Sequence, residues 1–201
     1  MKKLFKKNES GRSMVEMLGV LAIIGVLSVG GIAGYKYAMR QIAKNSFAEF
    51  LNYWGLTVEY IYSTGIIDDI PLGAGADNYL TNKEIFCSSG IFPQKYCDAS
   101  GHYFSPEHSL FSERFYTYHS SNNGITLGLF LKPYSPKNDA ERQEKIENCK
   151  EVIKIASSVF PDAYFDSPNN FGDTDAEGAL VGCEKAPLYL YINAFWYKAE
   201  E

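Results

Sequence analysis

Residues 17–34 read MLGVLAIIGVLSVGGIAG, a run of 18 residues without a charged side chain. A helix of about 20 apolar residues is long enough to cross the hydrocarbon core of a bilayer. The run therefore predicts a membrane-spanning helix near the N-terminus. Because positive charge favours the cytoplasmic side, we expect the leader to stay there and the chain after Tyr35 to lie outside. The basic residues before the run are Lys2, Lys3, Lys6, Lys7 and Arg12.

The composition of the whole chain excludes two classes of protein. Of 201 residues, 46% are hydrophobic and 15% are aromatic, so the chain can pack a sizeable core and is not a disordered protein. The formal net charge is −5, whereas a general nucleic-acid binder carries a basic face. We therefore infer no nucleic-acid partner.

Glu16 stands immediately before the uncharged run. A carboxylate within a membrane helix costs about 2.5–3.5 kcal/mol on insertion scales, so it is expected to have a partner. A cleaved signal peptide and a plain one-pass anchor both account for the apolar run, but neither explains this carboxylate.

The basic leader, Gly11, Glu16 and the apolar run together resemble the N-terminal signal of type IV pilins and pseudopilins. In that family a basic leader ends in glycine, a prepilin peptidase cuts after it, and the fifth mature residue is glutamate. The resemblance covers roughly residues 5–40 and makes Arg12 the first mature residue and Glu16 the fifth. Arg12 stands where the family usually has an N-methylated Phe or Met.

The resemblance implies a function, a set of partners and a location. The chain would be a structural subunit of a type IV pilus or of a type II secretion pseudopilus. The Glu16 carboxylate would pair with the amine that cleavage leaves on Arg12 of a neighbouring subunit. The partners would be copies of the chain or other pilins, the prepilin peptidase and an inner-membrane assembly platform. The precursor would span the bacterial inner membrane once, with its head in the periplasm. The alternative is a membrane-anchored extracytoplasmic binding module that never polymerises.

Hydrophobic periodicity after the run predicts an α+β fold. Apolar residues at three- and four-residue steps continue the helix to about Tyr62, and this stripe should pack against a small antiparallel sheet. Residues 63–106 look irregular. Strands are expected at 115–119 and 125–131, with Asn122-Asn123-Gly124 as their turn, and at 188–196. Asn138 and Glu141 form a capping box for a second helix that ends at Phe160.

Three parts of the chain are thus expected. Residues 1–11 form the prepilin leader. Residues 12–62 form the long helix, of which 12–34 is the transmembrane and assembly part. Residues 63–201 form a disulfide-stabilised α+β head.

The four cysteines all fall on the predicted outer side, where an even number favours disulfides. Three pairings are possible. We expect Cys87–Cys97, which closes a short loop, and Cys149–Cys183, which ties the second helix to the segment before the last strand. The second pair would resemble the C-terminal disulfide-bounded loop of many pilins.

Catalytic and metal-binding motifs are sparse. The three histidines are scattered and no GxSxG or HExxH pattern occurs, so we expect no enzyme and no cofactor. One acidic segment approaches the spacing of a calcium loop, although a solvated acidic loop is the simpler interpretation. Its candidate ligands are Asp173, Asp175, Glu177 and Glu184.

Overall fold

The computed structural model describes residues 10–73, 75–98, 100–104, 111–120, 124–167 and 170–194, with the backbone alone at 10–13, 76 and 113. The chain divides into two compact units, Met1–Gln41 and Ile42–Glu201. We call the second the head unit and describe each unit by itself.

Helix α1 (Ser10–Thr64) is 55 residues long and contributes to both units. It extends two residues beyond the predicted range at each end. In the first unit every side chain from Met14 to Ala38 is exposed. From Ala43 onward α1 is amphipathic, and its apolar side chains enter the core of the head unit.

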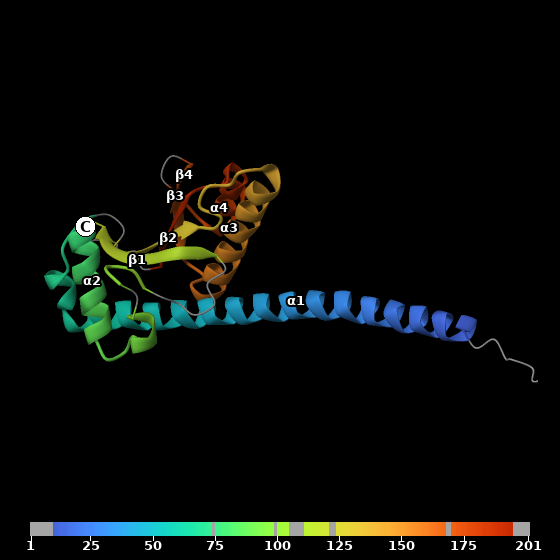
Figure 1. Ribbon diagram of the computed structural model, residues 1–201. Coiled ribbons are helices and arrows are strands. Elements are labelled where there is room, and N and C mark those ends of the chain that lie inside the picture. The colour runs from blue at the N-terminus through green and yellow to red at the C-terminus, as the bar shows by residue number, and fades with distance from the viewer. Residues whose placement is uncertain are drawn as a thin grey trace, which may run out of the picture. The chain divides into compact units, whose positions relative to one another are not determined.

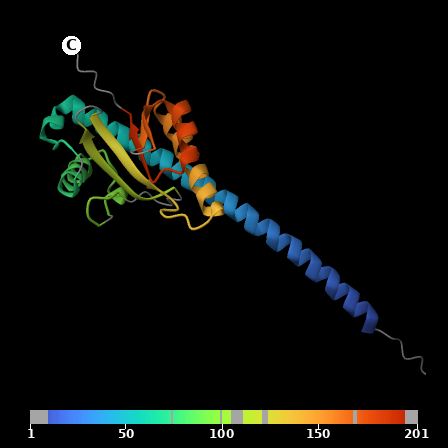
Figure 2. The ribbon, with the colours of Figure 1, turned by 90° about the horizontal axis from the view of Figure 1, so that it is seen from above.

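The head unit confirms the α+β prediction (Figure 1). In the described part of the head unit, five strands form one antiparallel sheet in the order β1-β2-β5-β3-β4. Figure 2 shows this sheet from above. The strands are β1 (Ser112–Ser120), β2 (Gly124–Leu131), β3 (Tyr164–Ser167), β4 (Phe171–Thr174) and β5 (Tyr189–Asn193). The predicted hairpin is present, since Ser120 pairs with Gly124, but residues 121–123 of its turn lie outside the described part of the chain.

One face of the sheet packs on α1 and on α3 (Asp139–Val159) to form the core. Leu127, Leu129 and Ile192 lie on this face and are fully buried. Trp54 of α1 is also fully buried, and its Nε1 donates to the Thr117 hydroxyl of β1 at 3.4 Å. This hydrogen bond satisfies the indole N–H inside an apolar core, where an unpaired donor would be costly.

Helix α3 begins with the predicted capping box. The Glu141 amide donates to Asn138 Oδ1 at 2.9 Å, while the Glu141 carboxylate accepts from the Lys137 amide at 2.7 Å. The last turn ends at Val159, before Pro161. The ion pair of Lys44 with Glu151, at 2.6 Å, joins α1 to α3.

The prediction that residues 63–106 are irregular is wrong. They contain α2 (Ala76–Ser88) and the short 3-10 helices η1 (Ile66–Asp69) and η2 (Gln94–Tyr96). The buried face of α2 combines Phe86 with the polar residues Asn82 and Lys83, so it has no apolar stripe for periodicity to detect.

Other short elements were also missed or mispredicted in extent. Strands β3 and β4, helix α4 (Ala176–Gly182) and the 3-10 helix η3 (Cys183–Lys185) were not predicted. The last strand is Tyr189–Asn193 rather than 188–196, and residues 195–201 lie outside the described part of the chain. Each of these elements is seven residues or fewer, too short to carry a clear hydrophobic period.

Candidate functional site

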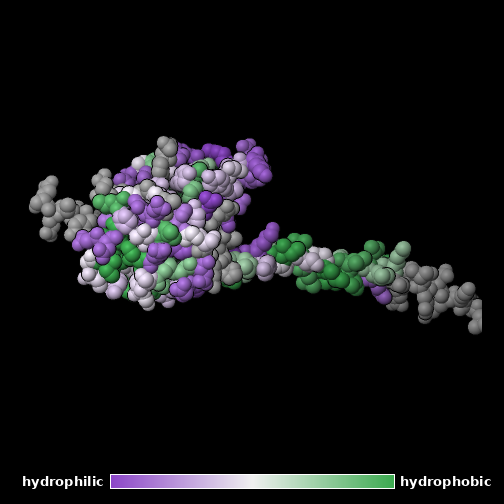
Figure 3. Space-filling view, turned by 60° about the vertical axis from the view of Figure 1, so that its left-hand side comes forward, coloured by the Kyte–Doolittle hydropathy of each residue, from purple (hydrophilic) through white to green (hydrophobic). Residues whose placement is uncertain are grey.

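The N-terminal half of α1 presents an unburied apolar surface. Its large hydrophobic side chains from Met14 to Tyr37 are 53–74% exposed. Among the described helices, α1 is the one that is long and apolar enough to cross a membrane, and none of its apolar window is buried. Figure 3 shows this half of the helix as a mostly hydrophobic surface. A patch of this kind marks contact with lipid or with other protein chains.

Glu16 lies within this surface and is itself exposed. Gly11 and Arg12 occupy the first turn of α1, and their side-chain surroundings are not described. The structure thus places Gly11, Arg12 and Glu16 on one helix.

The glycines of the apolar half do not serve packing within the chain. A Cβ atom added at Gly25, Gly30, Gly31 or Gly34 would meet no atom within 4 Å. Gly30 and Gly34 are four residues apart, a spacing that lets two helices approach closely.

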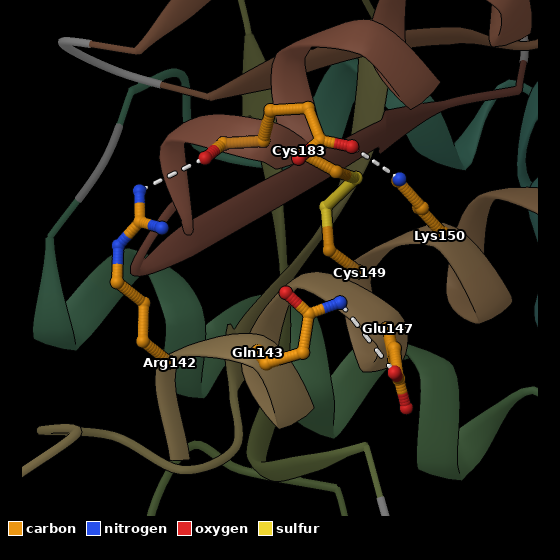
Figure 4. Close-up of polar contacts among 7 residues, drawn as sticks. Arg142, Gln143, Glu147, Cys149, Lys150 and Cys183 are labelled. Carbon is orange, nitrogen blue, oxygen red and sulfur yellow. Dashed lines mark hydrogen bonds and ion pairs between the residues drawn. A yellow bond between two sulfur atoms is a disulfide. The ribbon is translucent and has the colours of Figure 1, made fainter. Parts of the chain in front are cut away.

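The C-terminal disulfide joins Cys149 of α3 to Cys183, as expected from the sequence (Figure 4). Both cysteines are fully buried. Glu184 follows Cys183 in the chain; its carboxylate pairs with Lys150 and its carbonyl accepts from Arg142 Nη2 at 3.0 Å.

The other disulfide joins Cys87 of α2 to Cys97, which follows η2. The loop that it closes contains Phe92 and Tyr96, whose rings enter the aromatic part of the core. The described part of the chain holds no free cysteine.

The acidic segment 173–184 is a strand and a helix rather than an open loop. Asp173 belongs to β4, and Asp175 caps α4 by accepting from the Gly178 amide at 2.9 Å. Glu177 lies in the first turn of α4, and Glu184 pairs with Lys150. No group of three or more His, Cys, Asp or Glu side chains is placed to hold a metal ion among the described residues. Calcium binding by this segment, the less favoured of the two interpretations, stays an untested alternative.

Sequence reasoning missed a pocket on the sheet face opposite the core. We call it the tyrosine pocket, and its cavity volume is about 290 Å³. The strands line it with Tyr116, Phe130, Tyr189 and Tyr191; α2 and the segment after it contribute Tyr79, His102 and Tyr103. The signal was the strand alternation, which puts Tyr116 and Tyr118, and likewise Tyr189 and Tyr191, on the face away from the core.

Gly128 allows the rings of this pocket to approach one another. It lies between Tyr116 of β1 and Tyr191 of β5, its partners in the sheet register. A Cβ atom at Gly128 would lie 2.5 Å from Tyr116 Cζ, so the tyrosine ring covers the space that the glycine leaves. The two phenol oxygens of Tyr116 and Tyr191 are 3.4 Å apart.

The residues that line the tyrosine pocket are uncharged at neutral pH, and the positively charged Arg114 lies beside them. Burial, and to a lesser extent Tyr191, raises the pKa of Tyr116 far above its usual value, so this phenol keeps its proton. Burial first, and then Arg114 and Lys83, lowers the pKa of His102, which leaves the imidazole uncharged at neutral pH. The Arg114 guanidinium carbon lies 5.2 Å from the Tyr103 ring centre and 5.6 Å from that of Phe130.

Comparison with known proteins finds no matching family model, no matching curated protein and no matching solved structure. The architecture itself is pilin-like, since it combines a long N-terminal apolar helix, a small antiparallel sheet and two disulfides.

Proposed function

We propose that the chain is a filament subunit of the type IV pilin class, cut after Gly11 and assembled through the N-terminal half of α1. The proposal includes a single-pass precursor in the bacterial inner membrane with its head unit in the periplasm. The observation that supports it is the exposed apolar helix that carries one carboxylate, Glu16, near its start.

A filament accounts for both properties of this helix. Apolar side chains that are more than half exposed need a lipid or protein environment. Lipid surrounds the helix in the membrane, and a bundle of identical helices surrounds it in the filament. Glycines at 30 and 34 have free space around their Cα atoms, which a neighbouring helix can fill.

Glu16 gives the assembly a register. An unpaired charge in a dry environment is costly, whereas one that is paired and hydrogen-bonded costs far less. Cleavage after Gly11 creates an α-ammonium on Arg12, four residues before Glu16. The carboxylate of one subunit and the ammonium of the next therefore form the pair that fixes their axial offset.

The test compares Glu16→Ala with Glu59→Ala in cells that contain a prepilin peptidase and an assembly platform. Glu59 is a matched control because it is an exposed glutamate of the same helix, within the head unit. Mass spectrometry of the N-terminus reports cleavage, membrane fractionation reports insertion, and the sheared surface fraction reports filaments.

Both variants should be cut after Gly11 and inserted, and only Glu16→Ala should be lost from the filament fraction. Filaments of Glu16→Ala at the level of the unaltered chain would overturn the register role of Glu16. Correct cleavage and insertion with no filaments from the unaltered chain would favour a non-polymerising anchored module. A mature N-terminus beyond Glu16, or one that still carries the leader lysines, would overturn the proposal.

A further inference from the structure

We propose that the tyrosine pocket binds a sugar ring that carries a carboxylate, the hexuronic acid unit of a glycan. This inference concerns the head unit alone and is independent of whether the chain forms filaments. It rests on the size of the cavity, the chemistry of its walls and the charge beside it.

The size of the cavity selects a small, compact ligand. Ligand pockets commonly measure about 300–1,000 Å³, and this one, at about 290 Å³, is at the lower limit. It accommodates one six-membered ring with its substituents rather than an extended chain or a fused ring system. A glycan would enter with one terminal unit and leave the remainder in solvent.

The walls combine flat aromatic faces with hydroxyl groups. The face of an aromatic ring is electron-rich, so it attracts the polarised C–H bonds that a pyranose presents on its flat side. Five of the seven lining residues are tyrosines, each of which can both donate and accept a hydrogen bond. The raised pKa of Tyr116 keeps its phenol protonated, and neutral His102 can likewise donate and accept. Such paired capacity suits a ligand that is rich in hydroxyl groups.

The charge beside the pocket favours an anion over a cation as the ligand. An aromatic cage alone would suit a quaternary ammonium group. Here the Arg114 guanidinium already lies against the rings of Tyr103 and Phe130, and its Nη1 donates to the Tyr103 hydroxyl at 3.3 Å. Among the described residues, no carboxylate lines the pocket to balance a second cation. An anionic group is attracted instead, and the guanidinium fork matches a carboxylate.

The local backbone holds Arg114 in this position. The β1–β2 register shifts between Ser112 and Phe115, so β1 has a bulge there. The Ser112 hydroxyl accepts from the amides of Arg114 and Phe130 at 3.2 and 3.1 Å, and it donates to the Arg114 carbonyl at 2.8 Å. Bulges commonly re-aim a side chain, and this one is fixed on both strands.

Binding is measured by titration calorimetry on the full chain in a polyoxyethylene detergent, because sugar-based detergents would compete. The probes are methyl β-glucuronide and methyl α-galacturonide, their neutral counterparts methyl β-glucoside and methyl α-galactoside, and sodium acetate and choline chloride at equal ionic strength. We expect at least one uronide to bind about tenfold more tightly than its neutral counterpart, the worth of one charge-assisted hydrogen bond.

Two variants test separately what the charge of the guanidinium and what the aromatic rings contribute to binding. Arg114→Gln should abolish the tenfold preference for the acid and leave the neutral sugar unchanged. Tyr189→Leu should weaken both sugars at least fivefold. The matched controls are Arg142→Gln, an exposed arginine of α3, and Tyr164→Leu, an exposed tyrosine of β3 outside the pocket, and both should bind as the unaltered chain does.

Four results would overturn the proposal. They are the absence of heat with every sugar at about 50 mM, equal affinity for acid and neutral sugar, acetate binding as tight as uronide binding, and choline binding more tightly than either uronide. Retention of sugar affinity by a folded Tyr189→Leu variant would equally show that the pocket is not the site.

Discussion

Removal of each disulfide tests how the cross-links stabilise the head unit, and the two cross-links predict different magnitudes. The perturbations are the double variants Cys149→Ala/Cys183→Ala and Cys87→Ala/Cys97→Ala. A disulfide restricts the unfolded chain, and its contribution grows with the logarithm of the loop that it closes. The sequence separations are 34 and 10 residues.

These loop lengths correspond to about 3.8 kcal/mol for the 149–183 disulfide and about 2.7 kcal/mol for the 87–97 disulfide. Packing also makes the loss of stability larger for the 149–183 disulfide, because Cys149 and Cys183 are fully buried whereas Cys87 and Cys97 are half-buried. Loss of both cross-links should cost about 6.5 kcal/mol if they act independently, a large share of the 5–15 kcal/mol that a typical domain has.

The assay is urea unfolding of the full chain in detergent micelles, followed by tryptophan fluorescence, since Trp54 is fully buried in the core. The free energy of unfolding should fall more for the 149–183 variant, by about 1 kcal/mol relative to the 87–97 variant. The reverse order, or a loss below about 1 kcal/mol for either variant, would refute the loop-closure reasoning.

Three further predictions concern single positions of the head unit. Gly128→Ala places a Cβ 2.5 Å from Tyr116 Cζ and should cost about 1–3 kcal/mol in urea unfolding; an unchanged midpoint would mean that the ring moves aside freely. Asn138→Ala removes the cap of α3 and should cost about 1 kcal/mol, whereas Asn138→Asp should retain most of the stability in the same assay. The pKa of His102 is lowered in the folded state, so the unfolded state binds more protons just below pH 6.5. The stability of the fold is therefore full above pH 6.5 and falls as the pH drops through the lowered pKa of His102. Thermal unfolding at pH 7 and pH 5 should therefore differ less in His102→Gln than in the unaltered chain, and an equal difference would contradict this assignment.

Local signals in the sequence determined the elements whose cause lies within a few residues. The uncharged run of residues 17–34 predicts an apolar helix because hydropathy is additive along a segment. Asn138 and Glu141 predict the start of α3 because a capping box joins residues three apart. The β1–β2 hairpin follows equally from alternation and a turn signal.

Tertiary structure decided whatever depends on residues that are distant in the sequence. Helix α2 buries Asn82 and Lys83 against the rest of the head unit, so its inner face has no hydrophobic period that sequence reasoning could detect. The cysteines allow three pairings; the sequence favoured the pair Cys149–Cys183, and the fold brings these two residues together. The tyrosine pocket exists because α2, the segment after it and the three strands β1, β2 and β5 meet on one face of the sheet. Each tyrosine on its own was an ordinary strand, helix or loop residue, and only the register across Gly128 brings Tyr116 and Tyr191 within reach of each other.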